Sequence, residues 1–300
     1  MDLIDAQIHP VIGRKALEGL SGERLIAASA DLAVASLDAV GVRAANVNWR
    51  DLELLKGHVE RYPDRFVAVP AAISLSLDGR FDPVVTHADP PDEYVARIAE
   101  SPGFVGIRMG ISYGRLIDLY RAGVHEPYYA AAEKHGVPVF ITLFDYAAEF
   151  EPTIRAHSKL RFIIDHVGLP TPPSGSTPGK PIKGGAHLFA GLPGVIALAR
   201  YPNVAVKFTA VPSLSAEPYP FADVWPHMRK LIDAFGADRM MWGSDFTRCV
   251  SLHSYRESVD FFVLTDQLSE TEKEAMASKT FLDWVGSPIG WQQEAAGVRK

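Results

Sequence analysis

The sequence predicts a single-domain α/β protein with the (β/α)8 or TIM barrel fold. Three observations favour this fold class: short apolar runs rich in β-branched residues recur along the chain, helical segments lie between them, and no glycine-rich phosphate loop is found. Eight such units closing on themselves form a barrel, whereas an open doubly wound sheet usually has about five or six strands. We expect the domain to span residues 1–300.

The expected strands are the eight apolar runs themselves. They are Leu3–His9, Ala44–Trp49, Phe66–Ile73, Phe104–Met109, Val137–Leu143, Leu160–His166, Val204–Ala210 and Met240–Asp245. Apolar residues spaced by three or four predict helices between them, at Leu25–Val40, Asp51–Arg61, Asp92–Glu100, Tyr128–His135 and Phe221–Phe235. Two further helices, His253–Gln267 and Ser269–Val285, are expected to complete the outer layer, the second beginning with a capping box from Ser269 to Glu272.

One connection is unusually long. Residues 170–187 follow the sixth strand and are rich in proline, glycine and serine, which disfavour a helix. We interpret this stretch as an active-site lid. A domain linker is the alternative, although strand and helix segments continue on both sides of it.

Composition excludes several function classes. A hydrophobic fraction of 47% with 22% charged residues is typical of a chain that buries a large core. The net charge of −6 is spread along the chain without a basic tract, so neither nucleic acid nor an acidic membrane is an expected partner. The start of the chain lacks the pattern of a signal peptide, and no apolar run reaches a membrane span of about 20 residues. The single cysteine, Cys249, cannot form an internal disulfide and is interpreted as structural, so we expect a cytoplasmic protein.

Polar residues stand at the ends of the predicted strands, where a parallel barrel places its chemistry. Asp5, Gln7 and His9 are spaced by two in the first strand and are therefore expected to share a face. Asp165 and His166 end the sixth strand on opposite faces, so one of the two must face inward. Other histidines are expected to be structural: His58, His87, His125, His135 and His157.

Three other strand ends carry charged residues. Asp245 follows an apolar run and is a plausible general base, while Arg108 offers a bidentate clamp for a substrate carboxylate. Lys207 lies within an apolar strand, where an unpaired ammonium is costly, so it needs either an ion-pair partner inside the barrel or a substrate anion. Arg248 and Tyr113 follow strands eight and four and could reach a ligand or lie on the surface.

Together these strand ends resemble a known family. The segments that carry the resemblance are Ile4-Asp5-Ala6-Gln7-Ile8-His9, Gly103-Phe104-Val105-Gly106-Ile107-Arg108, Asp165-His166-Val167-Gly168-Leu169-Pro170, Pro202-Asn203-Val204-Ala205-Val206-Lys207 and Arg239-Met240-Met241-Trp242-Gly243-Ser244-Asp245. They look like the amidohydrolase 2 family, and most like its sugar-lactone and 2-pyrone-4,6-dicarboxylate lactonases. The resemblance implies a (β/α)8 barrel that hydrolyses lactones or, in other branches, decarboxylates aromatic or unsaturated acids, often with one divalent metal.

The resemblance also implies roles for individual residues. His9 matches the second histidine of the family's His-x-His, His166 the histidine of strand six, and Asp245 the aspartate of strand eight that activates water. Two ligand positions depart from the family: Gln7 replaces the first histidine, and the fifth strand ends at Leu143 without one. We therefore expect either no cofactor or one weakly bound zinc or manganese ion, held by His9, His166 and Asp245.

The leading hypothesis is a hydrolase of a lactone or similar cyclic ester that carries a carboxylate. Asp245, His166 and His9 are its candidate catalytic residues, and the candidate substrate-binding residues are Arg108, Gln7, Lys207, Arg248 and Tyr113. One alternative is a metal-dependent nonoxidative decarboxylase of an aromatic or unsaturated carboxylic acid. Another is an inactive barrel that only binds a small acid. The small-molecule substrate is the expected partner, together with a second copy in a homodimer.

Overall fold

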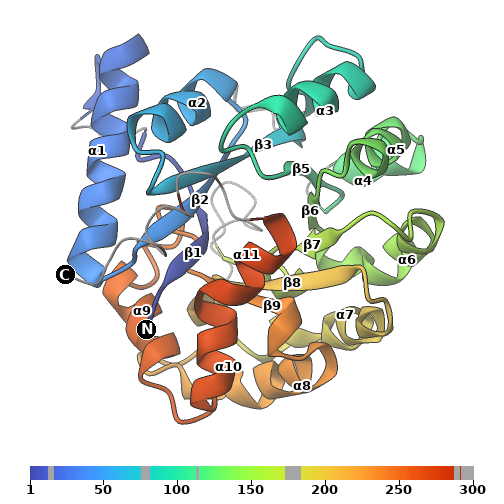
Figure 1. Ribbon diagram of the computed structural model, residues 1–300. Coiled ribbons are helices and arrows are strands. Elements are labelled where there is room, and N and C mark those ends of the chain that lie inside the picture. The colour runs from blue at the N-terminus through green and yellow to red at the C-terminus, as the bar shows by residue number, and fades with distance from the viewer. Residues whose placement is uncertain (13–16, 76–81, 113–114, 173–183, 287–290, 292–300) are drawn as a thin grey trace.

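The strands of this protein form a nearly closed parallel barrel surrounded by helices. The computed structural model describes residues 1–12, 17–75, 82–112, 115–172, 184–286 and 291. Within these ranges eight parallel strands pair in the order β1-β2-β3-β5-β6-β7-β8-β9 (Figure 1). They are β1 (Ile4–Ile8), β2 (Ala44–Trp49), β3 (Phe66–Leu75), β5 (Ile107–Gly110), β6 (Val139–Thr142), β7 (Phe162–Ile164), β8 (Val204–Thr209) and β9 (Met240–Gly243). The predicted (β/α)8 fold class is confirmed.

The ends of the sheet meet between β9 and β1. The backbone N–H of Asp245 donates to the carbonyl of Gln7 at 3.0 Å, and Ile8 forms a parallel bridge with Phe246. A short strand that the sequence pattern did not predict, β4 (Pro83–Val85), pairs antiparallel with the end of β3. The closure brings the end of the first strand next to the residues that follow the last one.

The outer layer contains the expected helices and three more. The bounds in the described residues are α1 (Gly22–Val40), α2 (Leu52–Arg61), α3 (Pro91–Glu100), α4 (Leu116–Arg121), α5 (Glu126–His135), α6 (Ala147–Ala156), α7 (Leu192–Ala197), α8 (Trp225–Phe235), α9 (Tyr255–Val263), α10 (Glu270–Glu274) and α11 (Thr280–Val285). Helices α4, α6 and α7 were not predicted, and α6 carries Pro152 inside it, a residue that usually ends helices. The predicted capping box is confirmed, because Ser269 accepts a hydrogen bond from the Glu272 N–H.

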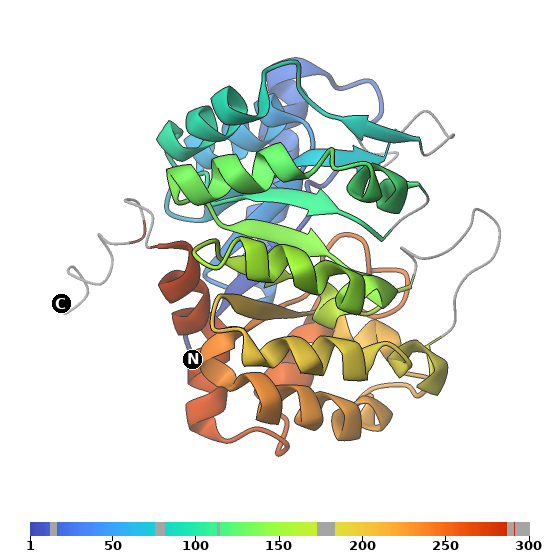
Figure 2. The same ribbon diagram turned by 90° about the vertical axis from the view of Figure 1, so that its right-hand side faces the viewer.

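The inside of the barrel is apolar only at its amino-terminal end. Inward side chains of the strands form a core there, made of Ile4, Ala6, Ala44, Val67, Val69, Val105, Phe140, Ile163, Ala205 and Met241. Phe281 of α11 and Trp291 pack against this core, and Figure 1 shows α11 lying across this end of the barrel. The strand arrows in Figure 2 point toward the opposite end, so that end is left for the polar side chains.

The long loop predicted at residues 170–187 is described only at its two ends. Of the predicted long loop, the structure describes residues 170–172 and 184–187, while residues 173–183 lie outside the described residues. A short 3-10 helix, Ala186–Phe189, begins at the end of this stretch. None of the helices in the described ranges combines the length and apolar character that a membrane span requires.

Candidate functional site

A layer of buried polar side chains lies directly above the apolar core, toward the carboxyl ends of the strands. The Nζ atom of Lys207 on β8 lies 5.0 Å from the centre of the Phe140 ring, which belongs to that core. Gln7 on β1 and Lys207 are both fully buried, as are His166 and Asp245 just beyond their strands. The polar site therefore begins where the apolar core of the barrel ends.

The lowest part of this layer is an ion-pair network centred on Asp165. Its Oδ1 lies 2.6 Å from Lys207 Nζ, and its Oδ2 accepts a hydrogen bond from Arg108 Nε at 2.6 Å. Burial by itself would raise the pKa of Asp165, but the charges of Lys207 and Arg108 outweigh it and lower that pKa below its ordinary value. The carboxylate is thus ionised, and the buried ammonium of Lys207 has its ion-pair partner inside the barrel.

Lys207 also fixes the orientation of Gln7. Its ammonium donates a hydrogen bond to Gln7 Oε1, so the NH2 group of Gln7 must face the other way. There Nε2 lies 2.9 Å from Asp245 Oδ1, 3.2 Å from His166 Nε2 and 3.4 Å from His9 Nε2. The three residues that the sequence predicts as catalytic are brought together around one nitrogen atom.

The surroundings of His166 keep its ring neutral. The Gln7 amide donates toward Nε2, and Nδ1 lies 3.3 Å from Thr209 Oγ1, so the hydrogen is placed on Nδ1. Burial lowers the pKa of His166 to about 3, in agreement with a neutral ring.

The backbone at this point departs from strand alternation. Strand β7 ends at Ile164, and both His166 (φ 52°) and Val167 (φ 50°) have left-handed backbone angles. As a result both Asp165 and His166 point into the barrel. The prediction that they lie on opposite faces is wrong, because the alternation of side chains holds only while the backbone stays extended.

His9 and Asp245 form a second buried pair. The Nδ1 atom of His9 lies 2.8 Å from the carbonyl oxygen of Asn48, which can only accept, so Nδ1 carries a hydrogen. The Nε2 atom lies 3.0 Å from Asp245 Oδ1, and this contact is a hydrogen bond only if the two residues share one further proton. Burial would raise the pKa of Asp245, but the neighbouring His166, His9 and Arg248 lower it well below its ordinary value, which favours the aspartate anion.

Asp5 does not join this cluster. Its carboxylate accepts hydrogen bonds from the Ser244 backbone N–H at 2.9 Å and from the Tyr255 hydroxyl at 2.9 Å. The pairing of β1 with β2 shifts register between Asp5 and Ile8, so Asp5 does not converge with Gln7 and His9 as the spacing predicted. Burial raises the pKa of Asp5 to about 6. The contacts show that Asp5 ties β1 to the segment after β9.

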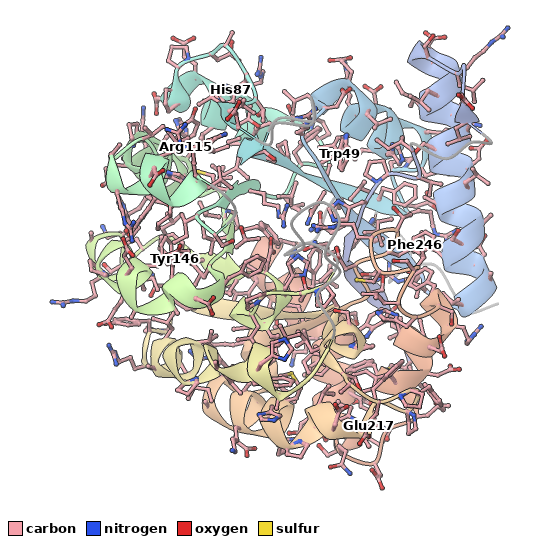
Figure 3. The ribbon with its side chains drawn as sticks, turned by 180° about the vertical axis from the view of Figure 1, so that it is seen from behind. Trp49, His87, Arg115, Tyr146, Glu217 and Phe246 are labelled. Atoms are coloured by element: carbon pink, nitrogen blue, oxygen red, sulfur yellow. The ribbon has the colours of Figure 1, made fainter. Side chains whose placement is uncertain are left out.

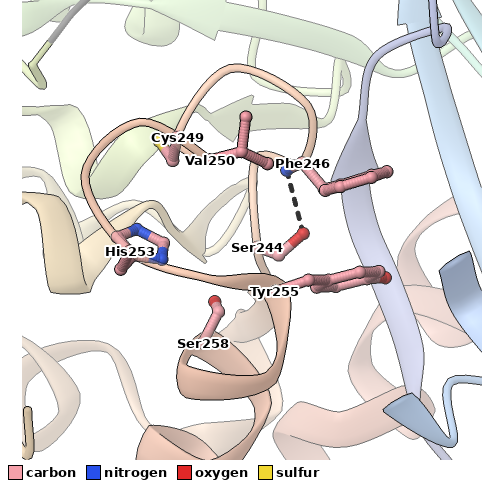
Figure 4. Close-up of a pocket in the computed structure, with 7 residues that line it drawn as sticks. All are labelled: Ser244, Phe246, Cys249, Val250, His253, Tyr255 and Ser258. Carbon is pink, nitrogen blue, oxygen red and sulfur yellow. Dashed lines mark hydrogen bonds between the residues drawn. The ribbon is translucent and has the colours of Figure 1, made fainter. Parts of the chain in front are cut away.

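A small pocket lies beneath the loop that follows β9 (Figure 4). Its lining consists of Ser244, Phe246, Cys249, Val250, His253, Tyr255 and Ser258. It has no room for a water molecule, so it is not a ligand site. The Cys249 thiol at its edge lies 3.6 Å from Asp245 Oδ2, and burial raises the pKa of this thiol well above its ordinary value. Cys249 is therefore a protonated neighbour of Asp245.

Three further residues predicted to bind substrate are Arg108, Arg248 and Tyr113. Arg108 uses Nε for Asp165, while its buried Nη2 atom has no hydrogen-bond partner in the described structure. Arg248 is half-buried and close enough for its charge to lower the pKa of Asp245. Tyr113 lies outside the described residues. Figure 3 shows the barrel from the side opposite to Figure 1, with Trp49 at the end of β2 and Phe246 after β9 labelled.

Sequence reasoning missed Asn48. It is fully buried near the end of β2, and neither Nδ2 nor Oδ1 has a hydrogen-bond partner among the described residues. Counting by two from Ala44, which belongs to the inner apolar core, would have placed Asn48 on the inward face beside His9. Unpaired polar atoms in a buried position are uncommon and point to a ligand or an ordered water molecule.

A family model described as amidohydrolase matches residues 4–280. The chain belongs to the amidohydrolase family. No curated protein sequence matches it. The match spans all eight strands of this amidohydrolase, including the strand ends that carry the polar site.

Solved structures share the fold of this amidohydrolase at low sequence identity. An amidohydrolase from Burkholderia multivorans with bound zinc has 17% identity and a TM-score of 0.68, over 96% of this chain and 100% of that one. A probable 2-pyrone-4,6-dicarboxylic acid hydrolase from Acinetobacter baumannii, with citric acid bound, has 16% identity and a TM-score of 0.63, over 96% and 100%. A 5-carboxyvanillate decarboxylase from Sphingomonas paucimobilis has 14% identity and a TM-score of 0.57, over 95% and 98%. At this identity the likeness shows the fold alone.

Since one of these structures holds zinc, the polar site of this amidohydrolase must be tested for a metal. The nitrogen that lies between His9, His166 and Asp245 belongs to an amide NH2 group, which offers hydrogens rather than a lone pair. Among the described residues, no three His, Cys, Asp or Glu side chains are arranged so that they could hold a metal ion. The residues as arranged do not fit a divalent cation.

Proposed function

We propose that this amidohydrolase hydrolyses a lactone or similar cyclic ester that carries a carboxylate. The observation that carries the proposal is the convergence of Asp245, His9 and His166 beside Arg108, whose Nη2 has no hydrogen-bond partner in the described part of the chain. A base, a proton-sharing imidazole and an anion-binding group are the three functions that hydrolysis of a carboxylated ester requires. One fold neighbour is named as a probable 2-pyrone-4,6-dicarboxylic acid hydrolase, and the substrate in that name is a cyclic ester that carries carboxylates.

Asp245 is proposed as the base. The aspartate anion takes a proton from water as the water oxygen attacks the ester carbonyl carbon. His9 Nδ1 carries a hydrogen toward the Asn48 carbonyl, so His9 can stabilise the oxyanion that develops on the carbonyl from Nε2 only as the protonated imidazolium, and the proposal requires that form. When the ring carbon–oxygen bond breaks, the proton held by Asp245 passes to the leaving alkoxide, and the product is a hydroxy acid. His166 stays a proposed catalytic residue, and its neutral ring holds the Gln7 amide in place.

Arg108 is proposed to hold the substrate carboxylate. Asp165 anchors the guanidinium through Nε, so the direction of the guanidinium is fixed, while the buried Nη2 has no hydrogen-bond partner among the described residues and is proposed to meet the substrate anion. Its side chain is 16% exposed, in contrast to the fully buried Lys207. We therefore assign the carboxylate to Arg108, place Lys207 beneath it as support, and keep Arg248 and Tyr113 as further proposed contacts.

The test compares Asp245→Asn with the wild type on a panel of carboxylated and uncarboxylated lactones. Ester hydrolysis releases an acid, so turnover can be followed with a pH indicator. Loss of a general base is expected to lower kcat by about 10²–10⁴-fold. Asp118→Asn, which changes an exposed carboxylate on α4, serves as the control and should keep wild-type turnover.

Each outcome of this experiment decides between the candidate functions. Full turnover by the Asp245→Asn variant would contradict the role of Asp245. Release of carbon dioxide from aromatic carboxylic acids, with no lactone hydrolysed, would assign a decarboxylase instead. Stabilisation of the protein by a lactone acid without any product would assign a binding protein.

A further inference from the structure

We infer that the Gln7 amide, locked by Lys207, occupies the place of a divalent cation and thereby excludes one. The inference concerns the resting site and does not depend on which substrate is hydrolysed. It rests on the position of one nitrogen atom, on the contact that fixes its orientation, and on the charge next to it.

The position of Gln7 Nε2 is that of a central atom. It lies between 2.9 and 3.4 Å from an oxygen of Asp245 and from the Nε2 atoms of His166 and His9. These three side chains supply a carboxylate oxygen and two imidazole nitrogens, which are donor types that zinc takes in catalytic sites, but they stand around the amide at distances longer than the roughly 2.0–2.2 Å of zinc ligands. Here they surround an amide NH2 group instead, whose two hydrogens point to the Asp245 oxygen at 2.9 Å and to His166 Nε2 at 3.2 Å.

The orientation of the Gln7 amide is fixed by Lys207, on the side away from His9, His166 and Asp245. An amide that turned over would present Oε1, a lone-pair donor, to the same three side chains. Oε1 is instead bound by the ammonium of Lys207, and turning the amide over would set the NH2 group against that ammonium. Since Gln7 and Lys207 are both fully buried, no water can replace the lost contact without rearrangement.

The positive charge of Lys207 also disfavours a divalent cation at this position. Lys207 Nζ forms an ion pair with Asp165 at 2.6 Å, which keeps a positive charge on the far side of the Gln7 amide. A second, divalent positive charge on the near side would be repelled across a dry environment, where such repulsion is weakly screened. A neutral NH2 group holds the same three side chains together without that cost.

The experiment measures zinc binding without any substrate. Purified wild type and two variants, Gln7→His and Gln7→Leu, are compared by metal content after dialysis against zinc chloride and by calorimetric titration. The Gln7→His variant places an imidazole lone pair where the NH2 group now lies, and about one zinc per chain is expected. The Gln7→Leu variant fills the same space without a lone pair and is the matched control, expected to bind zinc as weakly as the wild type.

A third variant, Lys207→Met, keeps the inference testable if Gln7→His fails to fold. It frees the amide to present its oxygen and removes the positive charge, so zinc affinity should rise by about 10-fold or more, the scale of effects from neighbours of metal ligands. Thermal unfolding of each variant checks that it is folded.

Stoichiometric, tight zinc in the wild type would overturn the inference, as would a folded Gln7→His variant and a folded Lys207→Met variant that both bind zinc no better than the wild type. Because no substrate is present, these results are separate from the success or failure of the lactone assay.

Discussion

Asp165→Asn is the substitution that should most strongly unfold this protein. The Asp165 carboxylate is the ion-pair partner of the buried Lys207 and also accepts from Arg108 Nε. The asparagine variant leaves a buried ammonium without its counter-charge, and breaking a buried ion pair from one side costs about 3–5 kcal/mol. For a chain of 300 residues the unfolding entropy is about 0.6 kcal/mol per kelvin, so Tm should fall by about 5–8 °C.

Scanning calorimetry of the variant against the wild type measures this fall. Asp92→Asn is the matched control, because Asp92 pairs with Lys134 and His135 at the surface and its loss should leave Tm nearly unchanged. Adding Lys207→Met to Asp165→Asn removes the uncompensated ammonium and should restore part of the lost stability. A Tm within about 2 °C of the wild type for Asp165→Asn would refute the reasoning that the network is a buried ion pair.

Two further predictions concern stability. Asn48→Leu removes two buried polar atoms that have no partner among the described residues, so the free energy of unfolding should rise by about 1–3 kcal/mol while lactone turnover falls. The control Asn46→Leu should lower stability, because the Asn46 amide donates to the carbonyl of Ala6, and a lower Tm for both variants would show that Asn48 is paired. Burial also lowers the pKa of His125 from 6.5 to about 4. Between pH 6.5 and 4 the His125 ring is therefore protonated in the unfolded chain but neutral in the folded protein. Protonation favours the unfolded chain, so about 3 kcal/mol of the free energy of unfolding, present above pH 6.5, should be lost as the pH falls to 4. The free energy of unfolding, measured with urea between pH 6.5 and 4, should depend less on pH for His125→Asn than for the wild type. The same pH dependence in both proteins would contradict the lowered pKa of His125.

The sequence by itself determined the fold and the kinds of residue at the site. The strand runs and the periodic helices depend on neighbours along the chain, so their pattern could be interpreted locally, and the parallel barrel then places Gln7, His9, Arg108, His166 and Asp245 at one end. The short helix α6 was not predicted from the sequence, because Pro152 inside it is a residue that usually ends helices. The extent of β7 was overestimated because positive φ angles leave no mark in hydrophobic periodicity.

Only the tertiary structure decided how the polar residues are paired. Barrel closure brings Lys207 to Asp165, and Lys207 in turn directs the Gln7 amide toward His166 and Asp245. Barrel closure also leaves Asn48 without a partner among the residues that the structure describes. These contacts join strands far apart in the sequence, and their geometry depends on the register of every strand between them. Periodicity reports which face of one strand a side chain occupies, and the distance across the barrel is set by all of the strands together.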